Sequence, residues 1–464
     1  MSIAKTKRFL ERWMGDAAFR ALFLENPAQT VKDYGFDVKP EEVALLCDRE
    51  AIKEHGDRPL PSSVIAYRDF IQQKKKHREQ IRLSSAPLNE RFRKWRQRQM
   101  VRSTLELGRH RSEAIIHAPF TVELCQGCSV GCWFCGVSAK SFKGYLPYTK
   151  ENAHLWQEIL KSLKEVIGQR CAGNGFCYWG TDPFDNADYE KFALDFRNIL
   201  GRLPQVTTAQ ASRDLDRTAK YLQFSKANGG FVERFSVLTR RAFEQIMEYF
   251  TPEELLNVEL ILQFDNTKFP KALAGKARQF LDKRKAQGKA VPAVMRFEEE
   301  ATIACVSGFL INLQNKTLEL ISPCIADDNW PEGYLIFARR KFSDAQDFKQ
   351  KLQDMIAKDM RISLAGEDVL QLSPHFRFEA QQNTLHCRYK DGSLSIPYVP
   401  FLDSLFPLLQ QGDLTAKEIA LSQYRNKGID PVETFQSLND LFQRGLFAEI
   451  LQKAPTEKLI QIGI

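Results

Sequence analysis

The sequence predicts an α/β protein whose central unit lies between a helical N-terminal region and a small C-terminal unit of strands and helices. Between residues 113 and 345, runs rich in β-branched and aromatic residues alternate with helical patterns. This alternation is typical of βα units around a parallel sheet. Residues 1–85 show helical spacing alone, and residues 365–455 combine short strand patterns with helical ones.

The composition is that of a folded protein with several domains. The chain has 464 residues, of which 43% are hydrophobic, so about two to four domains are expected. The net charge of +8 is mild and fits ordinary solubility better than a dedicated acidic partner. No apolar run approaches the length of a membrane span, and no signal peptide is visible. We therefore expect a cytoplasmic protein without a membrane partner.

The first two regions are expected to be helical. In residues 1–85, apolar side chains such as Phe9 and Phe19 recur at helical spacing, which predicts a small helical domain. Residues 86–112 follow as a basic helical linker that includes Arg102. We expect this linker to be a solvated helix, and a track for an acidic peptide substrate is the alternative.

The central unit is predicted to be built from βα repeats. Strand patterns occur at 119–124, 175–179, 205–211, 231–238, 258–264 and 302–313, and helical patterns occur at 151–166, 189–200 and 241–249. In barrels of parallel strands, the active site lies at the carboxyl ends of the strands. The loop after the first predicted strand is at such an end.

That loop carries three cysteines, Cys128, Cys132 and Cys135, at a spacing of three residues and then two. Several cysteines arranged in this way in a cytosolic protein usually hold an iron–sulfur cluster. Three ligands on a four-iron cluster leave one iron open for a substrate or cofactor. No second group of cysteines has ligand spacing, so we expect one cluster and no auxiliary one.

The pattern Cys-x3-Cys-x-aromatic-Cys closely resembles the signature of the radical SAM (S-adenosyl-L-methionine) superfamily. The resemblance implies a partial βα barrel, one 4Fe-4S cluster on these cysteines, SAM as the second cofactor, and Phe134 packed near the adenine. It also implies an electron donor such as flavodoxin or ferredoxin, whose electron cleaves SAM to a radical that abstracts hydrogen.

A second expected contact for SAM is the turn after the predicted strand at 175–179. Radical SAM enzymes carry a Gly-Gly-Glu-Pro-like turn there, and this chain departs from it, because Thr181 and Asp182 follow Gly180 in place of the Gly-Glu portion. We expect Gly180, Thr181 and Asp182 to help seat SAM, with an ordinary β-turn around Asp182 as the alternative. Ser236, near a later strand end, is a further candidate for a cofactor contact.

Two segments further along the chain bear on the reaction. The run Leu-Ile-Ser-Pro-Cys that ends at Cys324, and the run Trp-Pro-Glu-Gly-Tyr that ends at Tyr334, resemble the radical SAM peptide epimerases of proteusin-type RiPP pathways. RiPPs are ribosomally made, post-translationally modified peptides. The resemblance implies that an α-hydrogen is removed and that a thiol returns a hydrogen from the other face. Cys324 is the candidate donor, Cys387 is a weaker one, and Cys305 is expected to be a packed core thiol.

The C-terminal unit, residues 365–455, is predicted to be winged-helix-like. Strand patterns at 376–378, 385–389 and 394–396 are followed by three helical patterns. The unit resembles a RiPP recognition element, which binds a precursor's leader peptide as an added strand at a sheet edge. No basic residue stands between Pro431 and Phe442, which disfavours a DNA-binding winged helix.

Together these features predict a radical SAM epimerase that converts L- to D-residues in a precursor peptide. The first alternative is another radical SAM RiPP maturase that forms a crosslink or excises backbone. A leader-binding scaffold without activity and a DNA-binding regulator are further alternatives, and we expect no nucleic-acid partner.

Overall fold

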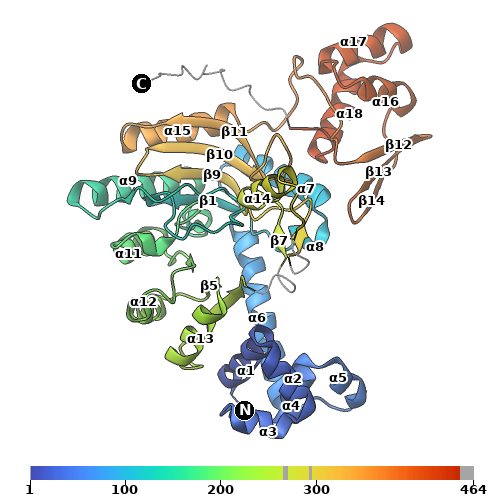
Figure 1. Ribbon diagram of the computed structural model, residues 1–464. Coiled ribbons are helices and arrows are strands. Elements are labelled where there is room, and N and C mark those ends of the chain that lie inside the picture. Colours follow the sequence, from blue (N-terminus) through green and yellow to red (C-terminus); the bar gives the residue numbers. More distant parts are fainter. Residues whose placement is uncertain (1, 265–269, 292–294, 450–464) are drawn as a thin grey trace.

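The computed structural model describes residues 2–264, 270–291 and 295–449, so the last residues of the predicted C-terminal unit, 450–455, lie outside the described residues. It has a mixed α/β architecture, which confirms the predicted class. The N-terminal helices, blue in Figure 1, form a unit apart from the sheet, and the C-terminal unit, red, lies at the other end of the molecule.

The N-terminal unit is built from helices α1 to α5, and α6 runs from it to the central unit (Figure 1). Its aromatic core centres on Phe9, whose ring makes edge contacts with Phe19 and Phe23 at centroid distances of 5.3 and 5.0 Å. The predicted helical domain is therefore observed. The helices span Ile3–Gly15 (α1), Ala17–Glu25 (α2), Pro27–Asp33 (α3), Pro40–Cys47 (α4), Arg49–His55 (α5) and Ser62–Ser84 (α6).

The central sheet begins with β1 (Ala118–Glu123), which pairs in parallel with β9 (Val306–Asn312). Strands β10 (Thr317–Pro323) and β11 (Tyr334–Lys341) continue the sheet, and both of their pairings are antiparallel. A purely parallel sheet was expected, so this edge differs from the prediction. The physical reason is connection length, because short links between strands allow hairpins, whereas parallel neighbours need a long crossover.

The other strands form parallel βα units, as predicted. Strands β4 (Thr207–Thr208), β5 (Glu233–Val237) and β6 (Val258–Leu262) pair in parallel. The predicted strand at 175–179 is reduced to one parallel bridge between Phe176 and β1. The connecting helices are α9 (Lys150–Ile167), α10 (Gln169–Ala172), α11 (Tyr189–Leu200), α12 (Leu215–Ala227) and α13 (Arg240–Tyr249).

Shorter elements complete the central unit. They are β2 (Cys125–Gln126), β3 (Gly144–Tyr145), the 3-10 turn η1 (Pro183–Asp185), β7 (Lys271–Ala272), α14 (Lys276–Ala286), β8 (Phe297–Glu298) and α15 (Ala345–Lys358). Strand β2 pairs with β3, and β7 pairs with β8, so each of these pairs fastens a long loop at its base.

The predicted basic linker is helical, with α7 (Glu90–Leu107) followed by α8 (Arg109–Ser112), but it is not solvated. Arg96, Arg98 and Arg102 are buried at 4%, 2% and 1% exposure. The expectation of a solvated helix was wrong because α7 packs on the sheet, where Phe92 contacts the Phe309 ring at 5.5 Å. The guanidinium groups are buried because each finds hydrogen-bond acceptors.

The C-terminal unit has the predicted three strands and three helices. Strands β12 (Arg377–Gln381), β13 (Thr384–Tyr389) and β14 (Gly392–Ile396) form an antiparallel sheet in that order, followed by α16 (Leu402–Gln411), α17 (Ala416–Lys427) and α18 (Pro431–Gln443). A capping box formed by Thr415 and Glu418 begins α17. Within the described residues, no helix is both long and apolar enough to span a membrane.

Candidate functional site

The cysteine loop is a closed ring at the carboxyl end of β1. The β2–β3 pair joins its ends, and the Cys128 N–H donates to the Lys140 carbonyl at 2.9 Å. Gly127 permits this closure, since it has φ of 79° and an added Cβ would lie 2.2 Å from the Ser141 carbonyl oxygen. The chain folds back tightly on itself, which keeps all three predicted ligands on one short loop.

The three thiols suit a thiolate-bound metal group. Cys128, Cys132 and Cys135 are free and only partly buried. Burial raises the pKa of Cys128 to about 12. Burial, together with the neighbouring charge of Cys135, raises the pKa of Cys132 to about 11. A bound cation reverses both effects, because it stabilises thiolates. The Ala139 N–H already donates to the Cys135 Sγ at 3.4 Å, the kind of hydrogen bond that tunes cluster sulfurs.

The three thiol groups do not form a ready metal-binding site. In the part of the chain that the structure describes, no three Cys, His, Asp or Glu side chains form a group that could hold a metal ion. Ligand thiols must lose their protons when a metal binds, so binding changes the charge and the preferred directions of these side chains together. The donor types, their exposure and the closed loop fit an iron–sulfur cluster, whereas the final ligand geometry is not present.

Aromatic side chains cover one side of the loop. The Trp133 ring lies 4.8 Å from the Phe280 ring of α14, and the Lys271 ammonium lies 4.6 Å from the centre of the Phe134 ring. The Lys276 N–H at the start of α14 donates to the Cys135 carbonyl at 2.9 Å. The adenine contact expected for Phe134 stays a prediction. The Lys271 ammonium already lies against the Phe134 ring.

The turn at Gly180, Thr181 and Asp182 lies beside the cysteine loop, at the end of the segment that bridges to β1. The Gly180 N–H donates to the Glu123 carboxylate at 2.8 Å. Asp182 is 5% exposed and accepts hydrogen bonds from the Thr208 hydroxyl, at 2.7 Å, and from the Ala209 N–H, at 2.7 Å. The Asp182 carboxylate therefore braces the turn against the end of β4.

Thr181 is left as the partly buried side chain of this turn, without a hydrogen bond among the described residues. Its predicted role, and that of Asp182, in seating SAM stay predictions. Burial raises the pKa of both Glu123 and Asp182 above the ordinary range, and the Asp182 charge also raises the pKa of Cys128 and Cys132. The negative charge of Asp182 beside these thiols favours a cation here, including an ammonium group.

Asp185 joins the cysteine loop to two strand ends, and the sequence did not single it out. One of its carboxylate oxygens accepts from the Ser129 N–H at 2.9 Å, and the other accepts from the Gln210 amide at 2.8 Å. Arg213, in the segment after β4, donates to the Ser129 hydroxyl at 3.0 Å. The position of Asp185, three residues after Asp182, was the available signal in the sequence. Its hydrogen-bond partners, Ser129 and Gln210, are distant along the chain.

The remaining predicted site residues lie elsewhere. Ser236 is partly buried in β5, where it pairs with Ile261 of β6, and β4 separates it from the turn at Gly180. Cys387 lies in β13 and is buried in the core of the C-terminal unit. It therefore belongs to a different core from the cysteine loop.

Cys324 and Cys305 belong to different apolar clusters of the central unit. Cys324 is 3% exposed and belongs to the apolar cluster that also holds Trp95 of α7. Cys305 is partly buried and directly precedes β9, at the amino end of the parallel β1–β9 pair. It packs against the cluster that includes Tyr178 and Trp179 and against a smaller cluster that includes Leu107 at the end of α7.

Comparisons with known proteins give two similarities, and no protein-family model matches the chain. The crystal structure of BtrN in complex with AdoMet and 2-DOIA is 13% identical, with 52% of this chain and 82% of that chain covered and a TM-score of 0.34. A similarity of this size supports no inference, and none is drawn from it.

The second similarity is to a protein of Sinorhizobium fredii (strain NBRC 101917 / NGR234), described as "Uncharacterized protein y4wI". The two are 34% identical over 459 residues, which cover 97% of this chain and 88% of that protein. Identity at this level over nearly the whole length places both in one family. The chain belongs to the family of the Sinorhizobium fredii protein y4wI.

Proposed function

We propose that this protein is a radical SAM enzyme that binds one 4Fe-4S cluster through Cys128, Cys132 and Cys135. The observation that carries the proposal is the closed loop of three partly buried thiols at the carboxyl end of β1, which Asp185 fastens to the neighbouring strand ends. When bound, the cluster and SAM would supply a radical able to remove hydrogen from an unactivated carbon.

The residues of the chain have separate tasks in this proposal. Glu123 and Asp182 hold the turn at Gly180 rigid through their hydrogen bonds. Because these groups are occupied, Thr181 and the backbone of the turn would contact the amino group of SAM. The negative charge of Asp182 favours the positive charges of the ammonium group and of the sulfonium.

We further propose that the substrate is a peptide and that the reaction is epimerisation at an α-carbon. Removal of the α-hydrogen leaves a planar carbon radical, and a thiol on the opposite face completes inversion by giving up its hydrogen atom. The sulfur radical that results must then gain an electron and a proton from an external reductant such as flavodoxin or ferredoxin. Cys324 is the donor expected from the resemblance, and Cys305, which packs against the same apolar cluster as Trp179, is the alternative.

The C-terminal unit is the proposed binding site for the leader of the precursor. Strand β14 is the last strand of its sheet among the described residues, so its outer edge can accept a peptide strand. A cavity of about 370 Å³ lies next to it, between residues 396–401 and α18. Glu433, Asp440 and Arg444 are the charged residues of its lining, and Arg444 is paired with Asp440 at 3.7 Å. The lining therefore has no excess of positive charge for phosphates, which disfavours nucleic acid as the occupant.

Co-expression with the precursor peptide in heavy water tests the reaction. We expect each converted residue to gain a single deuterium with no other change in peptide mass. A crosslinking maturase gives a loss of mass and a backbone-excising one gives a shortened peptide, and either result would overturn epimerisation.

Two matched variants identify the donor. If Cys324 is the donor, Cys324→Ala abolishes deuterium uptake while 5′-deoxyadenosine is still formed, and Cys305→Ala retains uptake. The opposite pattern assigns the role to Cys305. Cys47→Ala, in the N-terminal unit, is the control and should behave as wild type. Normal deuterium uptake in both Cys324→Ala and Cys305→Ala would contradict hydrogen return from either of these thiols.

A further inference from the structure

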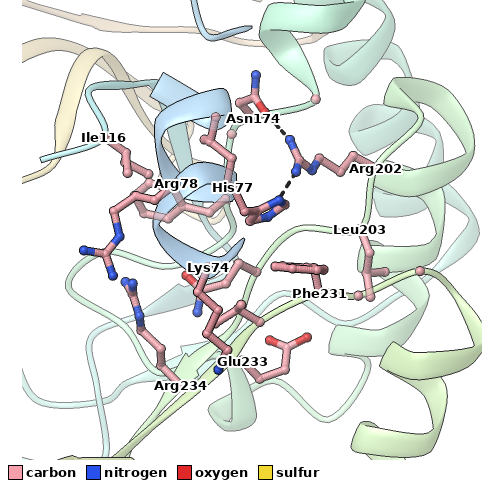
Figure 2. A pocket seen from close by; sticks show the side chains of 18 of the residues that line it. Lys74, His77, Arg78, Ile116, Asn174, Arg202, Leu203, Phe231, Glu233 and Arg234 are labelled. Atoms are coloured by element: carbon pink, nitrogen blue, oxygen red, sulfur yellow. Dashed lines mark hydrogen bonds between the residues drawn. The ribbon is translucent and has the colours of Figure 1, made fainter. Parts of the chain in front are cut away.

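A cavity of about 280 Å³ lies at the amino ends of the parallel strands, at the opposite end of these strands from the cysteine loop. Residues just before or at the start of β1, β4, β5 and β6 form one wall, including Ile116, Gln205 and Glu233. Helix α6 forms the other wall and contributes Lys74, His77, Arg78 and Ile81 (Figure 2). The cavity is therefore separate from the candidate cluster site.

Basic side chains dominate the lining. Arg202 donates to the Asn174 side chain at 2.6 Å and to His77 at 3.3 Å, and Arg234 donates to Glu259 at 2.9 Å. Arg78 has no hydrogen bond or ion pair among the described residues. In Figure 2 the guanidinium groups of Arg78 and Arg234 point toward one another. Two like charges in this arrangement favour an anion beside them.

The acidic side chains of the cavity do not balance these cations. Glu259 is ion-paired with Arg234, and the Lys74 and Arg78 charges also lower its pKa, so its single negative charge is shared among three cations. Glu233 is buried, and its oxygens accept from the Val206 N–H at 2.7 Å and the Ser225 hydroxyl at 2.6 Å. Burial raises the pKa of Glu233 to about 7, so near neutral pH it carries only part of a charge. Lys74, whose ammonium lies 4.7 Å from the Phe70 ring, adds a further cation.

The cavity also has an apolar part. The His77 and Phe231 rings pack together with their centroids 4.0 Å apart, Leu203 lies beside them in Figure 2, and Ile81 and Ile116 also line the cavity. A bare inorganic ion would leave this part of the wall without contacts. An anion joined to an apolar or flat group matches both halves of the lining.

We propose that this cavity binds a small organic anion, with its phosphate or carboxylate held by Lys74 and Arg78 on one face of α6 and its apolar portion against Phe231 and Leu203. Arginine suits this role because its planar group can donate two parallel hydrogen bonds to either kind of oxyanion. The site is independent of the proposed radical chemistry, so it can be tested without cluster or SAM.

Isothermal titration calorimetry of the full chain tests the site with three probes: inorganic phosphate, AMP and benzoate. We expect saturable binding of AMP or benzoate, with inorganic phosphate weaker than either. Binding of AMP alone identifies a phosphate as the anionic group, and binding of benzoate alone identifies a carboxylate. No saturable heat with AMP or benzoate at millimolar concentration would overturn the proposal.

Variants on α6 locate the binding. Arg78→Gln and Lys74→Gln should each weaken the bound probe by about tenfold or more, because each removes a charge-assisted hydrogen bond. Lys75→Gln removes an exposed charge from the same helix and should leave the affinity unchanged. Circular dichroism melting checks that the variants fold. Equal affinity in wild type and in folded Arg78→Gln would contradict the proposed site.

Discussion

At the scale of single residues, carboxylates rather than cysteines fix the geometry of the candidate site. Glu123 holds the Gly180 N–H, Asp182 braces the same turn against β4, and Asp185 ties this turn to the cysteine loop. The sequence interpretation gave Asp182 a direct part in cofactor binding. In the structure its oxygens are occupied by backbone and hydroxyl donors from residues 184, 208 and 209.

Replacing Asp185 by alanine should loosen the cysteine loop without removing a ligand. The Ser129 N–H and the Gln210 amide lose their common acceptor, and residues that orient metal ligands typically matter by about 10–100-fold in metal affinity. We expect Asp185→Ala to lose iron to a chelator at least about tenfold faster than wild type. The control is Asp216→Ala, an exposed site on α12. Equal rates of iron loss in all three proteins would contradict this role for Asp185.

At the scale of elements, amphipathic helices were predictable and buried charge was not. The structure begins and ends α9, α11 and α13 within one residue of the patterns at 151–166, 189–200 and 241–249. Their apolar faces are local in sequence, so periodicity is enough. The arginines of α7 look solvated in the sequence because their partners are remote: Arg96 donates to the His117 carbonyl, and Arg102 donates to the Pro323 carbonyl.

The glycines of the cysteine loop offer a matched pair of substitutions. Gly127 and Gly131 both have positive φ, at 79° and 67°. An added Cβ at Gly127 would lie 2.2 Å from a backbone oxygen, whereas at Gly131 nothing lies within 4 Å. We expect Gly127→Ala to lose most of the reconstituted iron, and Gly131→Ala, which bears only backbone strain of about 1–2 kcal/mol, to keep it. Iron content per chain is the measurement, and equal loss in both variants would show that loop closure at Gly127 is not required.

At the scale of the whole molecule, α7 joins the sheet to the C-terminal unit. Its Phe92 and Trp95 pack on the sheet, and the Arg98 guanidinium lies 4.0 Å from the centre of the Phe442 ring of α18. Arg98 also donates two hydrogen bonds to the Glu449 carboxylate, at 2.6 and 3.0 Å. A leader bound at β14 would thus sit on a unit that is fixed to the core.

Breaking this connection should free the C-terminal unit. The Arg98 and Glu449 side chains are 2% and 3% exposed, so Glu449→Ala leaves a buried arginine charge without its partner. We expect the opening free energy of α16–α18, measured by hydrogen exchange, to fall by about 3 kcal/mol or more. Glu367→Ala, which removes an 82%-exposed partner of Lys417, should change it by no more than about 0.5 kcal/mol. If the two substitutions lower the opening free energy of α16–α18 equally, the Arg98–Glu449 pair does not anchor the C-terminal unit.

The sequence predicts units and elements better than their mutual contacts. It predicts the helical N-terminal unit, the βα core and the three strands and three helices of the C-terminal unit, because turn residues and periodicity are local. It does not predict that β9, β10 and β11 form an antiparallel edge, or that Cys305 and Cys324 belong to different apolar clusters. Those properties depend on which distant segments become neighbours.

The central claim, a cluster on the cysteine loop, is tested most directly by anaerobic reconstitution with iron and sulfide, followed by iron analysis and electron paramagnetic resonance of the reduced protein. The account predicts about four iron atoms per chain. It also predicts a resonance that changes when SAM is added, and loss of both signals in Cys128→Ser, Cys132→Ser and Cys135→Ser. Cys125→Ser, only three residues before the motif and buried at 1% exposure, should keep both. A wild-type protein that gains no cluster, or a Cys128→Ser variant that gains the same one, would contradict the account.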